Sequence, residues 1–247
     1  MRYRQLSLVL AAVSVAVAAS AATASATATT ITVTPTNARS YGWTAHNEGA
    51  GAETFTGAFG APGSAYGTGA LELTTTASDA DQAYFGTSTV KDTPLSAITT
   101  LSYWNYTNSG PSYAGASLDL EIDTHARCGR HDPGSRSTTL VYEPYWNTAG
   151  SPGQVGTVAQ RVWTQWSIAS GSGLFWSQKS TCDAGGGGLA AQPGGPPTYT
   201  LEDVLTAYPD ATLEKLAVDV GSYNPGYDVA VDGVTINDTT YDFAPGS

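Results

Sequence analysis

The feature that most constrains this chain is a succession of short segments in which apolar and polar residues alternate, each bounded by Gly, Pro, Asn or Asp. A period of two is typical of strands with one buried face, and these segments are rich in β-branched and aromatic residues. The predicted strands are 30–34, 70–75, 82–86, 99–106, 117–123, 138–145, 161–167, 214–220 and 228–236. The sequence therefore predicts an all-β fold, an antiparallel β-sandwich.

One segment has the pattern of a helix. It spans 201–208, where Thr200 and Asp203 have the spacing of a capping box, and Pro209 follows directly. We expect a single short helix at this position.

The N-terminus carries Arg2 and Arg4 ahead of an apolar run from residue 6 to about residue 19, which ends among small residues. This is the pattern of a secretory signal peptide, and the run is shorter than the roughly 20 apolar residues of a membrane-spanning helix. We expect a signal peptide over 1–26 and a single domain over 27–247, with a flexible Gly/Pro-rich loop at 183–197. The chain is thus predicted to be secreted and extracellular, without insertion into a membrane.

The charge of the chain argues against anionic partners. Loss of the signal peptide removes two arginines and no acid, so the net charge changes from −11 to −13, that is, 8 basic minus 21 acidic residues. Nucleic acids and anionic membranes are bound largely through Lys and Arg, so we expect neither as a partner. Neutral polymers and divalent cations remain as candidate ligands.

Cys128 and Cys182 are the only cysteines of the chain. In an exported protein such a pair normally forms a disulfide, which is the pairing we predict. His125 and His131 lie at H-x-x-C-x-x-H spacing around Cys128, so a metal site there is the alternative.

Three carboxylates alternate with three aliphatic side chains in the segment 117–123. The carboxylates are Asp119, Glu121 and Asp123, and the aliphatic residues are Leu118, Leu120 and Ile122. Because a strand sends alternate side chains to opposite faces, the carboxylates are expected to line one surface, with the aliphatic residues packed inward. We interpret the row as an outward face. A structural calcium ion bound by the row is an alternative, because this cation takes oxygen ligands.

Aromatic residues are a further source of candidate ligand contacts. Flat rings bind the apolar faces of sugars, and a ring near a loop has the better chance of lying on the surface. Trp146 and Trp176 are each near a loop, and Tyr145 adjoins the first of them. We take these three residues as the predicted ligand-binding residues.

The tripeptide Glu121-Ile122-Asp123 resembles the start of the E-I-D-x-E strand motif of laminarinase-like glycoside hydrolases. The resemblance implies a jelly-roll fold, with Glu121 as nucleophile and Asp123 assisting it. The motif's last Glu, the acid/base, has no counterpart, since Thr124 and His125 stand where it should fall. If the predicted strand 138–145, which contains Glu143, pairs beside 117–123, Glu143 can share the same face, which makes Glu121, Asp123 and Glu143 the catalytic alternative.

A second resemblance covers residues 30 to 243. The ordered segments LSYWNYT, SLDLEID, TTLVYEPYW, RVWTQWSI, LFWS, YTLEDVLTAYPDATL, VDVGSYNPG and VAVDGVTINDTTYDF are similar to a recurring domain of bacterial secreted and cell-surface proteins. That resemblance implies a jelly-roll, lectin-like sandwich whose final strand lies around 229–236. It implies no activity.

The sequence favours a secreted, non-catalytic module that binds carbohydrate or another extracellular surface polymer. Export, acidity, the aromatic residues and the missing catalytic partner support this interpretation. No cofactor is expected apart from the calcium alternative. A polysaccharide-cleaving hydrolase of jelly-roll type and a structural or interaction domain without a ligand are the two other functions that remain open.

Overall fold

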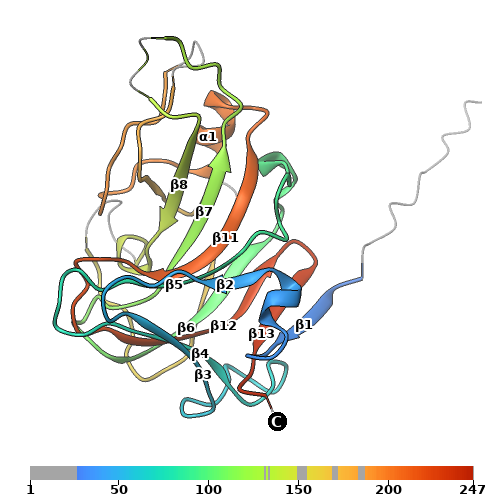
Figure 1. Cartoon of the computed structure of the whole chain (residues 1–247), viewed down its shortest axis with the longest axis vertical. Helices are drawn as coiled ribbons and strands as arrows, with labels where there is room; N and C mark the ends of the chain where they lie inside the picture. Colours follow the sequence, from blue (N-terminus) through green and yellow to red (C-terminus); the bar gives the residue numbers. More distant parts are fainter. Residues whose placement is uncertain are drawn as a thin grey trace, which may run out of the picture.

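The computed structural model describes residues 27–130, 132, 134–148, 155–168, 172–182 and 187–246. The predicted signal peptide over 1–26, His131, and residues 183–186 of the predicted loop lie outside the described residues. Within the described ranges the strands form two sheets, and the elements of each sheet can be followed in Figure 1.

Sheet A contains seven strands and sheet B contains six. Sheet A consists of β1 (Thr29–Val33), β3 (Ala52–Thr56), β4 (Ala70–Thr74), β6 (Leu101–Ser109), β9 (Thr164–Ser167), β12 (Asp228–Ile236) and β13 (Thr239–Phe243). Sheet B has the order β10 (Trp176–Ser177), β8 (Ser137–Tyr142), β7 (Ser117–Asp123), β11 (Thr212–Val220), β5 (Ala83–Thr87) and β2 (Trp43–Ala45). The predicted antiparallel β-sandwich is confirmed. Among the described strands, β1 departs from it by pairing in parallel with β13.

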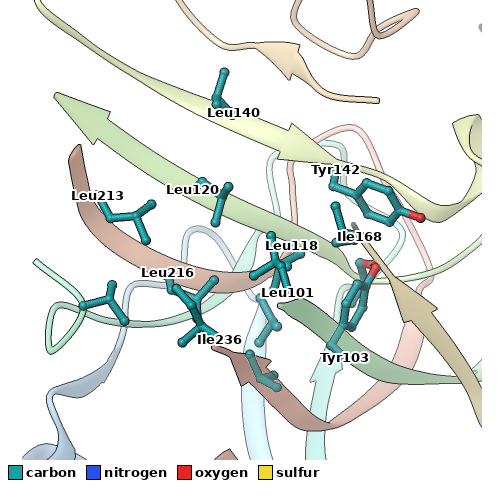
Figure 2. Packing of buried hydrophobic residues seen from close by; sticks show 14 of the residues in the cluster. Leu101, Tyr103, Leu118, Leu120, Leu140, Tyr142, Ile168, Leu213, Leu216 and Ile236 are labelled. Atoms are coloured by element: carbon teal, nitrogen blue, oxygen red, sulfur yellow. The ribbon is translucent and has the colours of Figure 1, made fainter. Parts of the chain in front are cut away.

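The interior between the sheets follows from the alternation in β7. Leu118, Leu120 and Ile122 have no solvent exposure and belong to one hydrophobic cluster with residues of sheet A. Figure 2 shows Leu118 and Leu120 in this cluster together with Leu101 and Ile236, which are cross-strand partners on β6 and β12. Burying such a side chain contributes about 1.5–3 kcal/mol, so the inward face is strongly specified. The intervening residues of β7 are therefore held on the outer face of sheet B.

The alternation in β6 also selects one of two sets of aromatic residues. Tyr103 points inward, has no solvent exposure, and donates its hydroxyl proton to the Ala116 carbonyl oxygen at 2.7 Å. Trp104 and Tyr106 are half-buried, on the opposite face of the strand. The sequence left open which set faces the core, because the period is the same for both.

Four of the described strands were not predicted from the sequence, namely β2, β3, β10 and β13. β2 and β10 are edge strands of three and two residues, too short for a period to be read. β8 ends at Tyr142 rather than at residue 145, because Pro144 begins the short 3₁₀-helix η3 (Pro144–Trp146). The other 3₁₀-helices are η1 (Ala38–Tyr41) and η2 (Leu95–Ala97).

The predicted helix is α1 (Leu201–Ala207), with the capping box in place. The Thr200 hydroxyl accepts the Asp203 backbone N–H at 3.1 Å, and the Asp203 carboxylate accepts the Thr200 N–H at 2.8 Å. It is the single α-helix of the described residues, and its seven residues are neither long nor apolar enough to cross a bilayer.

The predicted disulfide is also confirmed. Cys128 and Cys182 are joined across a sequence separation of 54 residues, with their Cα atoms 5.2 Å apart. The bond ties the loop after β7 to the segment that follows β10, so it holds the two loops together at one end of sheet B.

Candidate functional site

The outer face of sheet B carries a groove with a volume of about 960 Å³. Its floor is formed by side chains of the central strands, Tyr84, Ser117, Asp119, Glu121, Val141 and Asp219. Its walls include Glu48, Glu143, Tyr145, Trp176, Lys179 and Tyr223, mostly from loops and strand ends. We call this surface the sheet B groove.

Strand register sets which floor residues are neighbours. Asp119 of β7 lies opposite Ala217 of β11, and Asp219 of β11 lies opposite both Ser117 and Tyr84. Asp119 and Asp219 are therefore diagonal neighbours on adjacent strands, within reach of each other's electric field.

The two aspartates are buried but have few partners. Asp119 is 6% exposed, and one of its oxygens accepts the Ser117 hydroxyl at 2.8 Å. Asp219 is 7% exposed and accepts the Gln82 amide at 3.1 and 3.0 Å. Burial, together with the charge of nearby carboxylates, raises the pKa of Asp219 to about 7. Burial and the Asp219 charge raise the pKa of Asp119 well above its ordinary range.

Glu143 stands at the end of β8, where η3 begins, and lines the wall of the groove. The Trp176 indole N–H donates to its carboxylate at 2.7 Å. Burial raises the pKa of Glu143 above its ordinary value, although this hydrogen bond opposes the shift. The contact also fixes the orientation of the Trp176 ring, because a buried indole N–H needs an acceptor.

A flat aromatic ring lies on the floor. A Cβ atom placed on Gly86 would be 2.7 Å from the Tyr84 hydroxyl oxygen and 2.9 Å from a ring carbon, so the Tyr84 ring lies across the Gly86 backbone. Burial and the carboxylates of Asp119, Glu121 and Asp219 raise the pKa of Tyr84 well above its ordinary value, which keeps the phenol neutral. Tyr223 adds a second ring at the rim, where its side chain is 80% exposed.

Two of the three predicted carboxylates line the groove, and the third does not. Asp119 and Glu121 point to the outer face as expected. Asp123 instead accepts the Arg136 guanidinium at 2.8 Å and the His125 backbone N–H at 2.7 Å. Although burial opposes it, these hydrogen bonds hold the pKa of Asp123 below its ordinary value.

The predicted metal site and catalytic set can be compared with this geometry. Among the described residues, no group of three or more His, Cys, Asp or Glu side chains is placed to hold a metal ion, so the row Asp119, Glu121 and Asp123 does not form one. Glu121 and Glu143 both line the groove, whereas Asp123 is not among its lining residues. Of the three catalytic candidates, Glu121 and Glu143 therefore share the groove and Asp123 lies outside it.

Only two of the three predicted ligand-binding residues line the groove. Tyr145 and Trp176 line the groove, but Trp146 is not among the lining residues. The Trp146 ring packs on the backbone at Gly195, where an added Cβ would lie 2.6 Å from the indole nitrogen. Trp146 thus supports the wall through its contact with Tyr145, at 5.3 Å between ring centroids.

The sequence analysis did not single out Tyr84 and Asp219. A signal for each was present, since Asp219 alternates with the apolar residues of β11 and Tyr84 alternates with Ala83 and Phe85 of β5. That signal gives an outward face, but it does not say that the two side chains meet.

No protein-family model matches the chain, and no curated protein sequence matches it. Among solved structures, the family 11 carbohydrate-binding module of a cellulosomal cellulase of Clostridium thermocellum is similar at 13% identity. The TM-score is 0.40, over 79% of this chain and 86% of that one. A family 11 module from the same organism, in complex with a β-1,3-1,4-mixed-linked tetrasaccharide, is similar at 12% identity and a TM-score of 0.38, over 83% and 91% of the two chains. Likeness at this level assigns no ligand, so the function rests on the groove itself.

Proposed function

We propose that this chain is a secreted, non-catalytic module that binds a polysaccharide in the sheet B groove. The observation that carries the proposal is the Tyr84 ring on the floor of the groove, beside the Gly86 backbone and in register with Asp219 on the neighbouring strand. A pyranose has an apolar face, which stacks on a ring, and a rim of hydroxyls, which need hydrogen-bond partners.

The walls supply the same combination of groups. Trp176 is held by Glu143, and Tyr223 projects at the rim, so rings are available along the groove. Gln178 and Asn224 add amide groups, which can donate to and accept from hydroxyls. A ligand-free structural domain does not require such a groove.

Secretion is supported by the signal-peptide pattern of residues 1–26 and by the disulfide, which is stable in oxidising compartments. An exported protein meets polymers outside the cell. Among these, neutral polysaccharides are not repelled by the net negative charge of the chain.

The test is binding of the exported chain to an array of plant, fungal and bacterial polysaccharides, with reducing ends assayed in parallel. We expect binding without new reducing ends. Tyr84→Ala and Trp176→Ala should each weaken binding by tenfold or more, at about 1.4 kcal/mol per factor of ten. Tyr41→Ala is the matched control, because Tyr41 is 38% exposed on η1 and does not line the groove. Equal binding by all three variants contradicts the proposal.

One observation favours a hydrolase as the second candidate. Glu121 and Glu143 share the groove, and the raised pKa of Glu143 is the property that a general acid needs. Glu121, in turn, forms an ion pair with Lys215 at 3.5 Å. Release of reducing ends that disappears in both Glu143→Gln and Glu121→Gln would establish the hydrolase and replace the binding module.

A further inference from the structure

The sheet B groove holds more acid than base. Five carboxylates line it, those of Glu48, Asp119, Glu121, Glu143 and Asp219. The cations that line it are Lys179 and Lys215, with His46 as a titratable neighbour, and Lys215 is paired with Glu121 at 3.5 Å. The carboxylates of Asp119 and Asp219 on the floor are not part of that ion pair.

No described cation compensates the buried carboxylates. The pKa values of Asp119, Asp219 and Glu143 are set by burial, by one another's charges and by neutral donors such as Ser117 and Gln82, together with Glu48 for Asp219. A neutral donor stabilises a carboxylate but leaves its charge in place. The negative charge of the floor carboxylates is therefore not balanced by a cation among the described residues.

Asp119 has an oxygen available to a ligand. One oxygen accepts the Ser117 hydroxyl at 2.8 Å, and among the described residues the other has no hydrogen bond. The side chain is 94% buried yet lines the groove, so this oxygen faces the ligand space. The oxygen itself is not buried, so a hydrogen-bond donor of a ligand in the groove can reach it.

We propose that the groove binds a glycan with free, protonated amino groups, and that one ammonium group lies between Asp119 and Asp219. This inference rests on the proposed function and narrows its ligand class to amino sugars. An ammonium supplies three N–H donors and a positive charge, which are the two properties missing from the floor. Acetylated amino sugars and neutral glucans supply no positive charge.

The aromatic ring explains why the cation belongs to a sugar. Tyr84 lies in register with Asp219, so a pyranose that stacks on the Tyr84 ring places its substituents at the Asp219 carboxylate. A lysine side chain has no flat face for that ring, although its ammonium could reach the same carboxylates.

Binding of an amine should also release protons. Near neutral pH the pair Asp119 and Asp219 is partly protonated, since the pKa of Asp219 is raised to about 7 and that of Asp119 is raised as well. An ammonium favours the ionised carboxylates, so their protons pass to the buffer on binding. The other titratable and charged groups that line the groove are Glu48, Glu121, Glu143, His46, Tyr84, Tyr145, Lys179, Lys215 and Tyr223.

The experiment is titration calorimetry of the exported chain with three β-1,4-linked hexasaccharides that differ only at carbon 2 of each ring. They carry an amine (glucosamine), an acetamide (N-acetylglucosamine) or a hydroxyl (glucose). We expect the amine to bind about tenfold tighter or more, as for a charge-assisted hydrogen bond. Its binding heat should depend on the ionisation enthalpy of the buffer, and that of the neutral hexamers should not.

The variants are Asp119→Asn and Asp219→Asn, which keep the shape of the side chain and resemble its protonated form. Each should remove the preference for the amine over the glucose hexamer and should remove the proton release. Glu202→Gln is the matched control, because it removes one charge from an exposed position of α1 outside the groove. Thermal melting of each variant checks that the fold is retained.

The outcomes distinguish this inference from the proposed function. Equal affinity for all three hexamers overturns the preference for amines and leaves the carbohydrate-binding module in place. Absence of binding to these hexamers and to every array polysaccharide overturns both. Hexalysine is the remaining probe, and if it binds as tightly as the amine hexamer and depends equally on Asp219, the groove is a general cation site and the amino-sugar assignment is wrong.

Discussion

Two pairs of acidic residues, one on each sheet, both have raised pKa values but differ in their hydrogen-bond partners. Asp119 and Asp219 lie on the floor of the sheet B groove, and Asp232 and Asp242 lie on β12 and β13 of sheet A. Burial raises the pKa in all four, and the charge of Asp242 contributes to raising the pKa of Asp232 to about 8. A raised pKa by itself therefore does not identify the functional pair.

The difference lies in what the carboxylates contact. One Asp232 oxygen accepts the backbone N–H groups of Gly233 and Phe243 at 2.7 and 2.8 Å, which joins β12 to β13. Asp242 accepts the Thr32 hydroxyl at 3.0 Å, which adds β1. The groove pair accepts side-chain donors only, from Ser117 and Gln82. The sheet A pair holds the backbone together, whereas the groove pair faces the open groove.

The largest expected effect concerns pH and applies to both pairs. A carboxyl group whose folded pKa is raised binds more protons in the folded state, so the free energy of unfolding falls as pH rises. For Asp219 the fall lies between 3.8 and about 7, and at about 1.4 kcal/mol per pKa unit it is on the order of 4 kcal/mol. Urea denaturation across this range should show the fall, and Asp219→Asn should reduce it, while the contribution of Asp232 remains. A stability that rises over the same range would contradict the assigned direction.

Replacing one aspartate of each pair by alanine should change stability to different extents. Asp232→Ala leaves two buried N–H groups without an acceptor, so we expect a loss of about 3 kcal/mol or more in the free energy of unfolding. Asp219→Ala leaves only the Gln82 amide, which water in the groove can satisfy, so we expect a loss below about 1 kcal/mol. Urea unfolding of both variants is the measurement. Equal losses would mean that the groove pair is structural too.

Alanine substitutions at two glycines, one on each sheet, should have smaller effects on stability. Gly233 has a φ of +55°, and an added Cβ would lie 2.7 Å from the Tyr66 ring, so Gly233→Ala should cost about 1–2 kcal/mol of stability. In Gly86→Ala the added Cβ meets the Tyr84 ring, which can move into the open groove, and also the Ala217 Cβ at 2.9 Å, which is fixed to its strand. We expect a similar loss of stability there, together with a severalfold loss of glycan affinity. Thermal melting and calorimetry measure the two effects, and an unchanged affinity in Gly86→Ala would argue against Tyr84 as the sugar platform.

The smallest effects concern single hydroxyls. Thr32→Val removes the donor to Asp242, with an expected loss of about 1 kcal/mol in the free energy of unfolding. Ser117→Ala removes the donor to Asp119 on the groove floor, and we expect a smaller loss of stability with an altered affinity for the amine hexamer. If Ser117→Ala changes stability alone, its hydroxyl has no part in the ligand site.

Much of the fold was predictable because it depends on near neighbours in the sequence. The alternation in 117–123 placed Leu118 inside and Asp119 outside, and the capping box at Thr200 located α1. The two cysteines left one pairing. The edge strands β2 and β10 were missed, because three and two residues are fewer than a period needs.

The candidate site was predictable only in part. Asp123 has the same local pattern as Glu121, but β8 brings Arg136 beside it and withdraws it from the groove. Trp146 and Trp176 are both near loops, yet only Trp176 lines the groove, because the Trp146 ring packs on Gly195. Neither outcome follows from residues adjacent in the chain.

The sequence by itself determined the strand class, the outward face of the acidic row, the helix cap and the cysteine pair. The first three depend on side-chain period or on residues a few positions apart, which act before any long-range contact forms. The cysteine pair follows from number alone, because the chain has two cysteines. The tertiary structure alone decided that Asp219 and Tyr84 would join Asp119 on one floor. Ser117 and Asp219 are 102 residues apart in the chain, and packing of the hydrophobic face sets the register that makes them neighbours.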